Sequence, residues 1–406
     1  MFSKLFPRAI FGLTLMLMLA GFPASAQAPS AEPQRSTPED LYLLLDKKVG
    51  DEYVQMRNKL LAEQTLAFDV VAASEKSGRA GLAAFVLDQR RAAPDQFREW
   101  DAQSQLPPPS NRRGVVYFRN ERPGVAGEAF LLEQMWRPAR SGADAAAFVE
   151  MGALSSRGWV PQSPSALWRS LWTDSPNDYL AQAALIGIGA DRSDAGRALA
   201  SAILADEQNV PLSWRELMLE SMRRGKSPFG VEVVSPLLQQ FEPHATLFAE
   251  GCRVLAASPQ AAAREQLHQA ATDDARTPER RMVAWEACTT APQAGDAEVL
   301  TTLLKNKAIS DDQKEHAVSL LDRYPYEQAA PALRQILNES TSQSQVYYAA
   351  HTLARLHAGA GVPAAARAGD IEMLQGVSQR GDLAESVRKS VAEAAQSLRA
   401  KQPARE

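Results

Sequence analysis

The stretch Ser310–Leu321, SDDQKEHAVSLL, decides the fold because it has a counterpart 32 residues later, Ser342–Leu353, SQSQVYYAAHTL. In both stretches a serine is followed by glutamine after three residues, by alanine after seven and by leucine after eleven. Serine with glutamine three residues on is the capping box that begins an α-helix. Positions four residues apart lie on one face of that helix, so the alanine and the leucine share a face. The two stretches are therefore predicted to be equivalent helices of neighbouring repeats.

The same phase continues towards the N-terminus. Ser213 begins a third capping box, and Thr277 begins a helix that has proline in its first position. The starts at Ser213, Thr277, Ser310 and Ser342 are 64, 33 and 32 residues apart, so a further start is expected near position 245. A fixed period of this size indicates a solenoid, in which each pair of helices buries its apolar face against the next pair.

The sequence from 211 to 400 resembles the HEAT-like family of helical repeats. The residues that carry the resemblance are Val387–Ala395 (VRKSVAEAA), Val346–Ala350 (VYYAA) with Leu353, and Arg280–Ala284 (RRMVA). The resemblance implies a right-handed superhelix of stacked helical hairpins, with a groove that holds another macromolecule. It also implies a scaffold or adaptor more often than an enzyme. We therefore predict an all-α fold, a HEAT-like α-solenoid. Residues 114–120 (GVVYFRN) have the composition of a β-strand, so we also predict a short β-like loop there.

Composition and breaker residues divide the chain into segments. We predict a signal peptide at 1–26, a disordered leader at 27–36, an N-terminal helical region at 37–106, a linker or hairpin at 107–126, irregular helical repeats at 127–210, HEAT-like repeats at 211–400 and a polar tail at 401–406.

The first segment has the three parts of an export signal. Lys4 and Arg8 precede an apolar run over 10–20, and Ala24-Ser25-Ala26 matches the small-residue cleavage pattern. The apolar run is about half the ~20 residues that a membrane-spanning helix needs. We therefore expect cleavage before Gln27, no membrane span in the mature chain and a periplasmic location, with extracellular release as the alternative.

The overall charge argues against a nucleic-acid partner. Cleavage removes two of the 44 basic residues, so 42 remain against 48 acidic ones and the net charge becomes −6. A mildly acidic chain does not favour binding to nucleic acid.

The two cysteines leave two interpretations open. In an exported protein an even number of cysteines suggests a disulfide, here between Cys252 and Cys288. Counted from the repeat starts, both fall on one face of neighbouring helices. Packed helices are ~8–10 Å apart, however, whereas a disulfide needs Cα atoms at ~5.5 Å. The alternative is two buried free thiols that act as small apolar residues.

Two surfaces are candidates for binding. The residues Arg112, Arg113, Tyr117, Phe118 and Arg119 form either a linker or edge hairpin, or a protruding loop that contacts a partner. Trp168 and Trp172 are four residues apart, and they form either an aromatic platform for sugars or part of an aromatic core. In the same region Gly187 and Gly189 are expected to end a helix.

No motif indicates catalysis, a cofactor or a metal. The five histidines show no zinc-binding spacing, and a Gly-x-Ser-x-Gly elbow is missing. Gly225-Lys226-Ser227 resembles the end of a phosphate-binding loop, but Glu220 occupies the place of the required first glycine. We therefore expect no catalytic, cofactor-binding or metal-binding residues.

The functional expectation follows from architecture and location together. We expect an exported scaffold or adaptor that binds a protein partner on its concave face. The alternative is a helical protein directed at peptidoglycan or another glycan, through binding or catalysis, with the tryptophan-rich region 136–172 as its platform.

Overall fold

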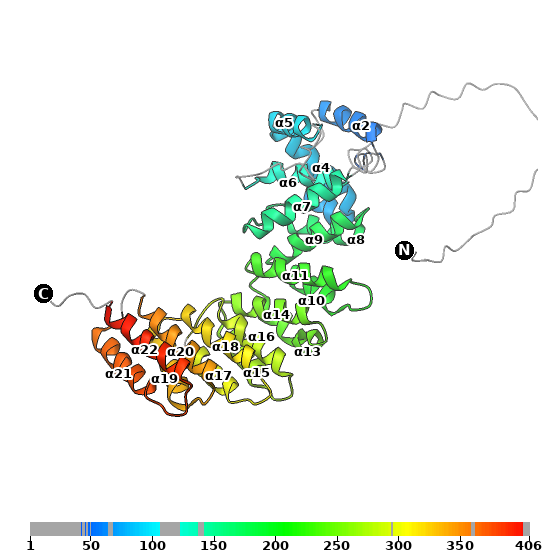
Figure 1. Cartoon of the computed structure of the whole chain (residues 1–406). Helices are drawn as coiled ribbons and strands as arrows, with labels where there is room; N and C mark the ends of the chain where they lie inside the picture. The colour runs from blue at the N-terminus through cyan, green and yellow to red at the C-terminus, as the bar shows by residue number, and fades with distance from the viewer. Residues whose placement is uncertain are drawn as a thin grey trace, which may run out of the picture. The chain divides into compact units, whose positions relative to one another are not determined.

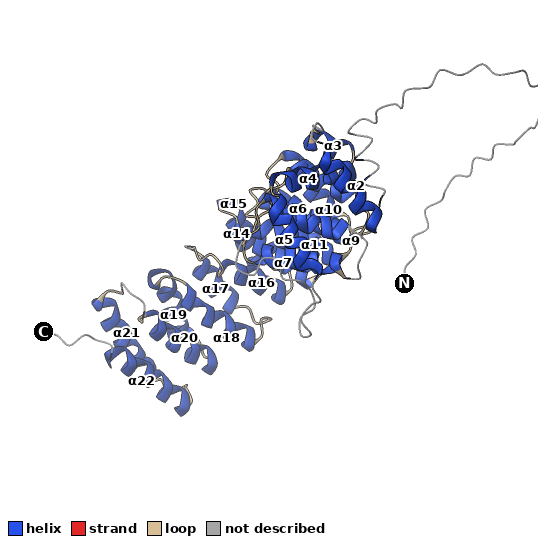
Figure 2. Ribbon diagram, turned by 90° about the horizontal axis from the view of Figure 1, so that it is seen from above, coloured by secondary structure: helices blue, strands red, loops and turns tan. Residues whose placement is uncertain are grey.

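The computed structural model describes residues 42, 45, 48, 50–63, 68–105, 122–136, 142–293, 295–358 and 362–400. Regular secondary structure in these ranges is helical throughout, without a strand (Figure 2). The prediction of an all-α fold is confirmed. The predicted signal peptide, the leader, the β-like loop near 114–120 and the tail lie outside the described residues.

The N-terminal half consists of helices of unequal length. They are α2 (Gly50–Ala62), α3 (Val70–Lys76), α4 (Gly78–Ala92), α5 (Pro94–Gln105), α6 (Val125–Trp136), α7 (Ala143–Ser156), α8 (Ser165–Asp174), α9 (Asp178–Ala190), α10 (Asp194–Ala205), α11 (Leu212–Arg224), α12 (Gly230–Val234), the 3₁₀ turn η1 (Ser235–Leu237) and α13 (Leu238–Phe241).

The C-terminal half repeats more regularly. Its helices are α14 (Ala245–Ala257), α15 (Ala261–Thr272), α16 (Pro278–Cys288), α17 (Asp296–Leu304), α18 (Asp311–Leu320), the 3₁₀ turn η2 (Leu321–Arg323), α19 (Tyr326–Glu339), α20 (Gln343–Leu356), α21 (Ala364–Val377) and α22 (Glu385–Ala400). None of the helices that the structure describes is both long and apolar enough to cross a bilayer.

These helices pack in two layers. In the first layer α14, α16, α18, α20 and α22 each contact the next one, and in the second layer α15, α17, α19 and α21 do the same (Figure 1). Second-layer helices also pack on the first helix of the following repeat, as α15 does on α16 and α19 on α20. The chain is therefore a helical solenoid, in which each repeat buries its apolar face against its neighbours.

The residues at fixed depth in each first-layer helix form the core between repeats. The small residues of the first column are completely buried, namely Cys252, Ala284, Ala317 and Ala349. The second column, one helical turn later, is also completely buried and consists of Cys288, Leu321 and Leu353. These buried columns confirm the predicted phase of the repeats.

Most of the predicted helix starts are N-caps. Ser310 caps α18 with a complete capping box, and the hydroxyls of Thr277 and Ser342 accept backbone hydrogen bonds at the starts of α16 and α20. The start that was expected near position 245 is α14, which begins at Ala245. Hydroxyl side chains thus satisfy amide donors that a helix cannot pair internally.

The predicted capping box at Ser213 was wrong. Helix α11 begins at Leu212 with Pro211 as its N-cap, so Ser213 lies in the first turn and makes no capping hydrogen bond. The fixed φ of proline suits this earlier start. Glu216, which was expected to complete the box, accepts a hydrogen bond from the hydroxyl of Thr246 on α14 instead.

The prediction that Gly187 and Gly189 end a helix was also wrong. Both lie inside α9, which continues to Ala190. A Cβ atom at Gly187 would lie 2.0 Å from Cδ2 of Trp168, and one at Gly189 would lie 2.6 Å from Cβ of Ser221. The glycines are therefore needed for close packing of α9 against α8 and α11, which outweighs their low helix propensity.

The N-terminal helices are joined by a buried carboxylate. Glu133 on α6 is completely buried and accepts hydrogen bonds from Tyr53 at 2.9 Å and from Arg57 at 2.8 Å, both on α2. Arg90 on α4 donates to the other carboxylate oxygen at 3.1 and 2.5 Å. A buried charge is tolerated when it is paired and hydrogen-bonded in this way.

Gly187→Ala should destabilise the protein, because the new methyl group has to displace the rigid ring of Trp168. We expect a loss of about 1–3 kcal/mol, the usual cost of overpacking. Gly152→Ala in α7 is the matched control, since no atom lies within 4 Å of its added Cβ. The control should be unchanged or stabilised by about 0.5–1 kcal/mol in urea denaturation. Equal effects of the two substitutions would contradict the packing argument.

Ser310→Ala should lower the free energy of unfolding by about 0.5–2 kcal/mol, because it removes a working N-cap. Ser213→Ala should change it by less than about 0.5 kcal/mol, since Ser213 is exposed and caps nothing. Denaturant unfolding of both variants measures the difference. A larger loss for Ser213→Ala than for Ser310→Ala would show that the two helix starts are assigned incorrectly.

Candidate functional site

Of the two candidate surfaces, the structure describes only the tryptophans. The loop of Arg112, Arg113, Tyr117, Phe118 and Arg119 lies outside the described residues and stays a prediction. Trp168 is 2% exposed and packs against Gly187. Trp172 is half-buried, and its ring lies 6.0 Å from that of Trp214. Trp168 therefore belongs to the core and is not accessible to a sugar, which corrects the platform interpretation for this residue.

Cys252 and Cys288 are free thiols in the structure, and both are buried. This arrangement is the alternative to the disulfide that the sequence left open. The two residues lie on α14 and α16, which contact each other, but the Cys288 thiol donates to the carbonyl of Ala284 at 3.6 Å. Burial raises the pKa of Cys288 to about 11, and the charge of Asp296 contributes to this shift. Burial also raises the pKa of Cys252.

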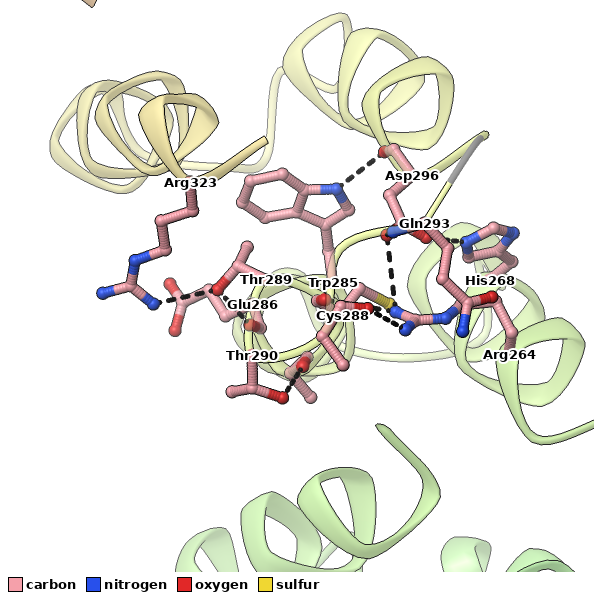
Figure 3. Close-up of polar contacts among 12 residues, drawn as sticks. Arg264, His268, Trp285, Glu286, Cys288, Thr289, Thr290, Gln293, Asp296 and Arg323 are labelled. Carbon is pink, nitrogen blue, oxygen red and sulfur yellow. Dashed lines mark hydrogen bonds and ion pairs between the residues drawn. The ribbon is translucent and has the colours of Figure 1, made fainter. Parts of the chain in front are cut away.

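Asp296 is the centre of a polar cluster that connects three successive helices (Figure 3). We call Arg264, His268, Cys288, Gln293 and Asp296 the Asp296 cluster. Asp296 is the first residue of α17 and follows Gly295, whose φ of 91° lets the chain turn into the helix. A carboxylate at this place is favoured by the helix dipole, although the side chain is completely buried.

The two carboxylate oxygens of Asp296 have different partners. Oδ2 accepts from the backbone N–H of Gln293 at 2.8 Å and from Arg264 at 3.4 Å. Oδ1 is bonded to Nε2 of His268 at 2.6 Å. The backbone carbonyl of Asp296 accepts from the indole N–H of Trp285 at 2.9 Å. One oxygen is thus held by fixed donors, whereas the other faces an imidazole.

Arg264 on α15 fixes the end of α16. Its guanidinium group donates to the carbonyls of Cys288 at 3.2 Å and Ala291 at 2.5 Å. The last carbonyls of a helix have no internal partner, so Arg264 satisfies groups that would otherwise be buried and unpaired. The Asp296 cluster therefore links α15, α16 and α17 and joins two successive repeats.

The cluster also gathers three residue types that bind metals. Ligand atoms of His268, Cys288 and Asp296 all lie within 4.8 Å of one another. The sequence analysis missed this set because it examined histidine pairs at local spacing, and these residues are 20 and 8 positions apart. The spacing of the repeats could have indicated this set, because residues on consecutive helices of a solenoid become neighbours.

A polar groove of about 770 Å³ lies elsewhere in the repeats, where α17, α18, α19 and α20 meet. It is lined by Thr301, Leu304, Lys305, Asp311, Lys314, Gln335, Ile336, Glu339, Ser340, Thr341, Ser342, Gln343, Ser344 and Gln345. Lys314 is only 9% exposed, whereas Lys305 and Thr341 are exposed. The lining combines hydroxyl and amide groups with two positive and two negative side chains.

Comparison with known proteins does not assign the chain to a family. No family model matches it, and no curated protein is similar to it. Among solved structures it is similar to human deoxyhypusine hydroxylase in complex with glycerol, at 16% identity and a TM-score of 0.28. That match covers 67% of this chain and 95% of the other. A similarity at this level carries no inference about function.

We expect neither thiol to react with an aromatic disulfide reagent in the native protein at pH 8. Both are buried, and the thiolate is the reactive form, which a raised pKa disfavours. After unfolding without reductant, both cysteines of the chain should react. A reading of zero after unfolding would show that Cys252 and Cys288 are bridged, and rapid reaction before unfolding would contradict their burial.

Proposed function

We propose that this chain is an exported, HEAT-like helical-repeat scaffold or adaptor that binds a protein partner. The groove at α17–α20 is the observation that supports the proposal most directly. The expectation from the sequence is a partner on the concave face of the repeats. The groove is the surface on which we propose to test that expectation first.

The groove needs more than one repeat to form. Thr301 and Lys305 come from α17 and its end, Lys314 comes from α18, and Glu339 and Gln345 come from α19 and α20. Its shape therefore depends on the stacking of helices and on the short connection 340–342 between α19 and α20. A preformed surface of this kind can bind a partner with little rearrangement.

The chemistry of the groove suits a peptide segment. An extended chain presents N–H and C=O groups, and serine, threonine and glutamine side chains can pair with both. Within the groove, however, Gln343 already bonds to residues 382 and 384, and Gln345 bonds to Ser340. The first turn of α20 also contributes backbone N–H groups that have no partner inside the helix. A volume of about 770 Å³ lies within the range of about 300–1,000 Å³ that is typical of ligand-binding clefts.

The glycan-directed alternative has less support. It was suggested by the tryptophans of the region 136–172, and Trp168 lies in the core. Only Trp172 of these tryptophans is partly exposed, so such a function would need Trp172 together with another surface. Binding to purified peptidoglycan that survives Trp168→Ala and is lost on blocking the groove would point to such a surface.

The test uses the mature full-length chain as bait in periplasmic extract, with quantitative mass spectrometry of the captured proteins. The groove variant combines Lys305→Glu with Thr341→Trp, which reverses one charge and fills the groove at exposed positions. The purified partner should then bind this variant at least tenfold more weakly, about 1.4 kcal/mol.

The matched control combines Lys307→Glu with Thr302→Trp. Both positions are exposed and close in sequence, and neither lines the groove. The control should bind the partner as the unmodified chain does. If no protein is enriched over background, the proposal of a protein partner is wrong. If both variants lose binding equally, the groove is not the binding surface.

A further inference from the structure

We propose that His268, Cys288 and Asp296 form a binding site for a divalent transition-metal ion, and that Zn²⁺ fits it best. The site would lie where α15, α16 and α17 meet, in the Asp296 cluster (Figure 3). The inference is independent of the proposed function, since the cluster and the groove share no residue.

The type of donor atom selects the metal. The three residues offer one imidazole nitrogen, one sulfur and one carboxylate oxygen. Zn²⁺ binds all three and accepts sets of three protein ligands with a fourth position for water or another group. Calcium and magnesium prefer oxygen ligands alone, so the sulfur and the imidazole argue against them.

The distances require only a local adjustment. Zinc bonds of about 2.0–2.3 Å place ligand atoms of a tetrahedral site roughly 3–4 Å apart. The ligand atoms here lie within 4.8 Å, and His268 Nε2 is 2.6 Å from Asp296 Oδ1. The ion would replace the hydrogen bond between these two atoms. The His268 side chain is 25% exposed, so it can move outward and leave a path for the ion.

Neighbouring groups form hydrogen bonds to the proposed ligand residues, as groups around the ligands of known metal sites do. Gln293 and Arg264 occupy Oδ2 of Asp296, which leaves Oδ1 directed at the imidazole. Arg264 also holds the backbone carbonyl of Cys288. Ligating carboxylates are commonly fixed by hydrogen bonds of this kind.

Binding of the ion releases one proton and leaves the cluster with one net positive charge, because Arg264 stays protonated beside Asp296. The Cys288 thiol releases its proton, and sulfur and nitrogen each donate an electron pair to the metal. Thiolate and carboxylate together then offset the two positive charges of the ion. Because the proton and the metal compete for the sulfur, affinity should fall as the pH is lowered. Arg264, the other cation of the cluster, donates to Oδ2 of Asp296 and also pairs with the Cys288 side chain, which favours the thiolate.

Titration of the mature, reduced full chain with Co²⁺ tests the site. Cobalt replaces zinc in such sites, and its bond to a thiolate gives a near-ultraviolet charge-transfer absorption. We expect this absorption to saturate at one equivalent and to be displaced by Zn²⁺. Cys288→Ser should abolish it, whereas Cys252→Ser is the matched control and should retain it, because Cys252 is equally buried and is not one of the clustered ligand residues.

A second variant covers the case in which Cys288→Ser fails to fold. His268 is half-buried, so His268→Ala should keep the helical circular dichroism while it weakens Co²⁺ binding roughly tenfold or more. Three results would overturn the proposal: no thiolate absorption, equal loss in Cys252→Ser, or unchanged affinity in a folded His268→Ala protein.

Discussion

The contact between successive first-layer helices is the constraint on which the rest of the structure depends. The first-layer helices α14, α16, α18 and α20 each present one small, completely buried side chain, which is Cys252, Ala284, Ala317 or Ala349 in turn. A small residue at constant depth lets the backbones approach, and the buried residues one turn later are Cys288, Leu321 and Leu353. Removal of this apolar area from water stabilises each junction, at about 25 cal/mol per Å². No repeat could retain its fold without a neighbour on which to bury this face.

The apolar columns do not by themselves fix how two neighbouring helices are oriented. Buried polar groups restrict that orientation, because their hydrogen bonds require particular partners. Asp370 on α21 accepts hydrogen bonds from Tyr326 at 2.5 Å and Arg334 at 2.7 Å, both on α19, and is bonded to His357 at 2.7 Å. Burial alone would raise the pKa of Asp370, but these three hydrogen bonds outweigh it and lower the pKa. Glu133 and Asp296 have the same role elsewhere, and each connects side chains from several helices. Removing one partner of such a group leaves a buried charge uncompensated, at a cost of about 3–5 kcal/mol.

The groove and the Asp296 cluster have a common origin in the stacking of repeats. Each is assembled from residues of successive repeats, and neither exists within one helical hairpin. The groove collects the ends of helices, where unpaired backbone groups and hydroxyl caps make the surface polar. The cluster lies between helices, where arginine and aspartate satisfy buried carbonyl and amide groups. The stacked repeats thus assemble two polar groups of residues, one around helix ends and one between helices.

The sequence by itself determined the class and the phase of the fold. Capping boxes and the small-residue column are local patterns of a helix. The N-cap Ser310, the buried Ala317 and the helix start near position 245 could therefore be predicted from the sequence alone. Where a residue's role depended on a distant neighbour, sequence reasoning failed. Gly187 was mistaken for a helix end because the ring of Trp168 that requires it is on another helix. The error at Ser213 had a local cause instead, because Pro211, two residues earlier, is the N-cap of α11.

Only the tertiary structure decided which polar residues meet. His268, Cys288 and Asp296 carry no shared motif, and each fits an ordinary helical position when it is read alone. Packing brings them together because α15, α16 and α17 contact one another, and the rotation of each helix is set by its apolar face. The same packing buries Trp168, and Cys252 and Cys288 are free thiols in it. Local sequence fixes where helices begin and which face is buried, whereas contacts between distant residues follow from how those faces fit together.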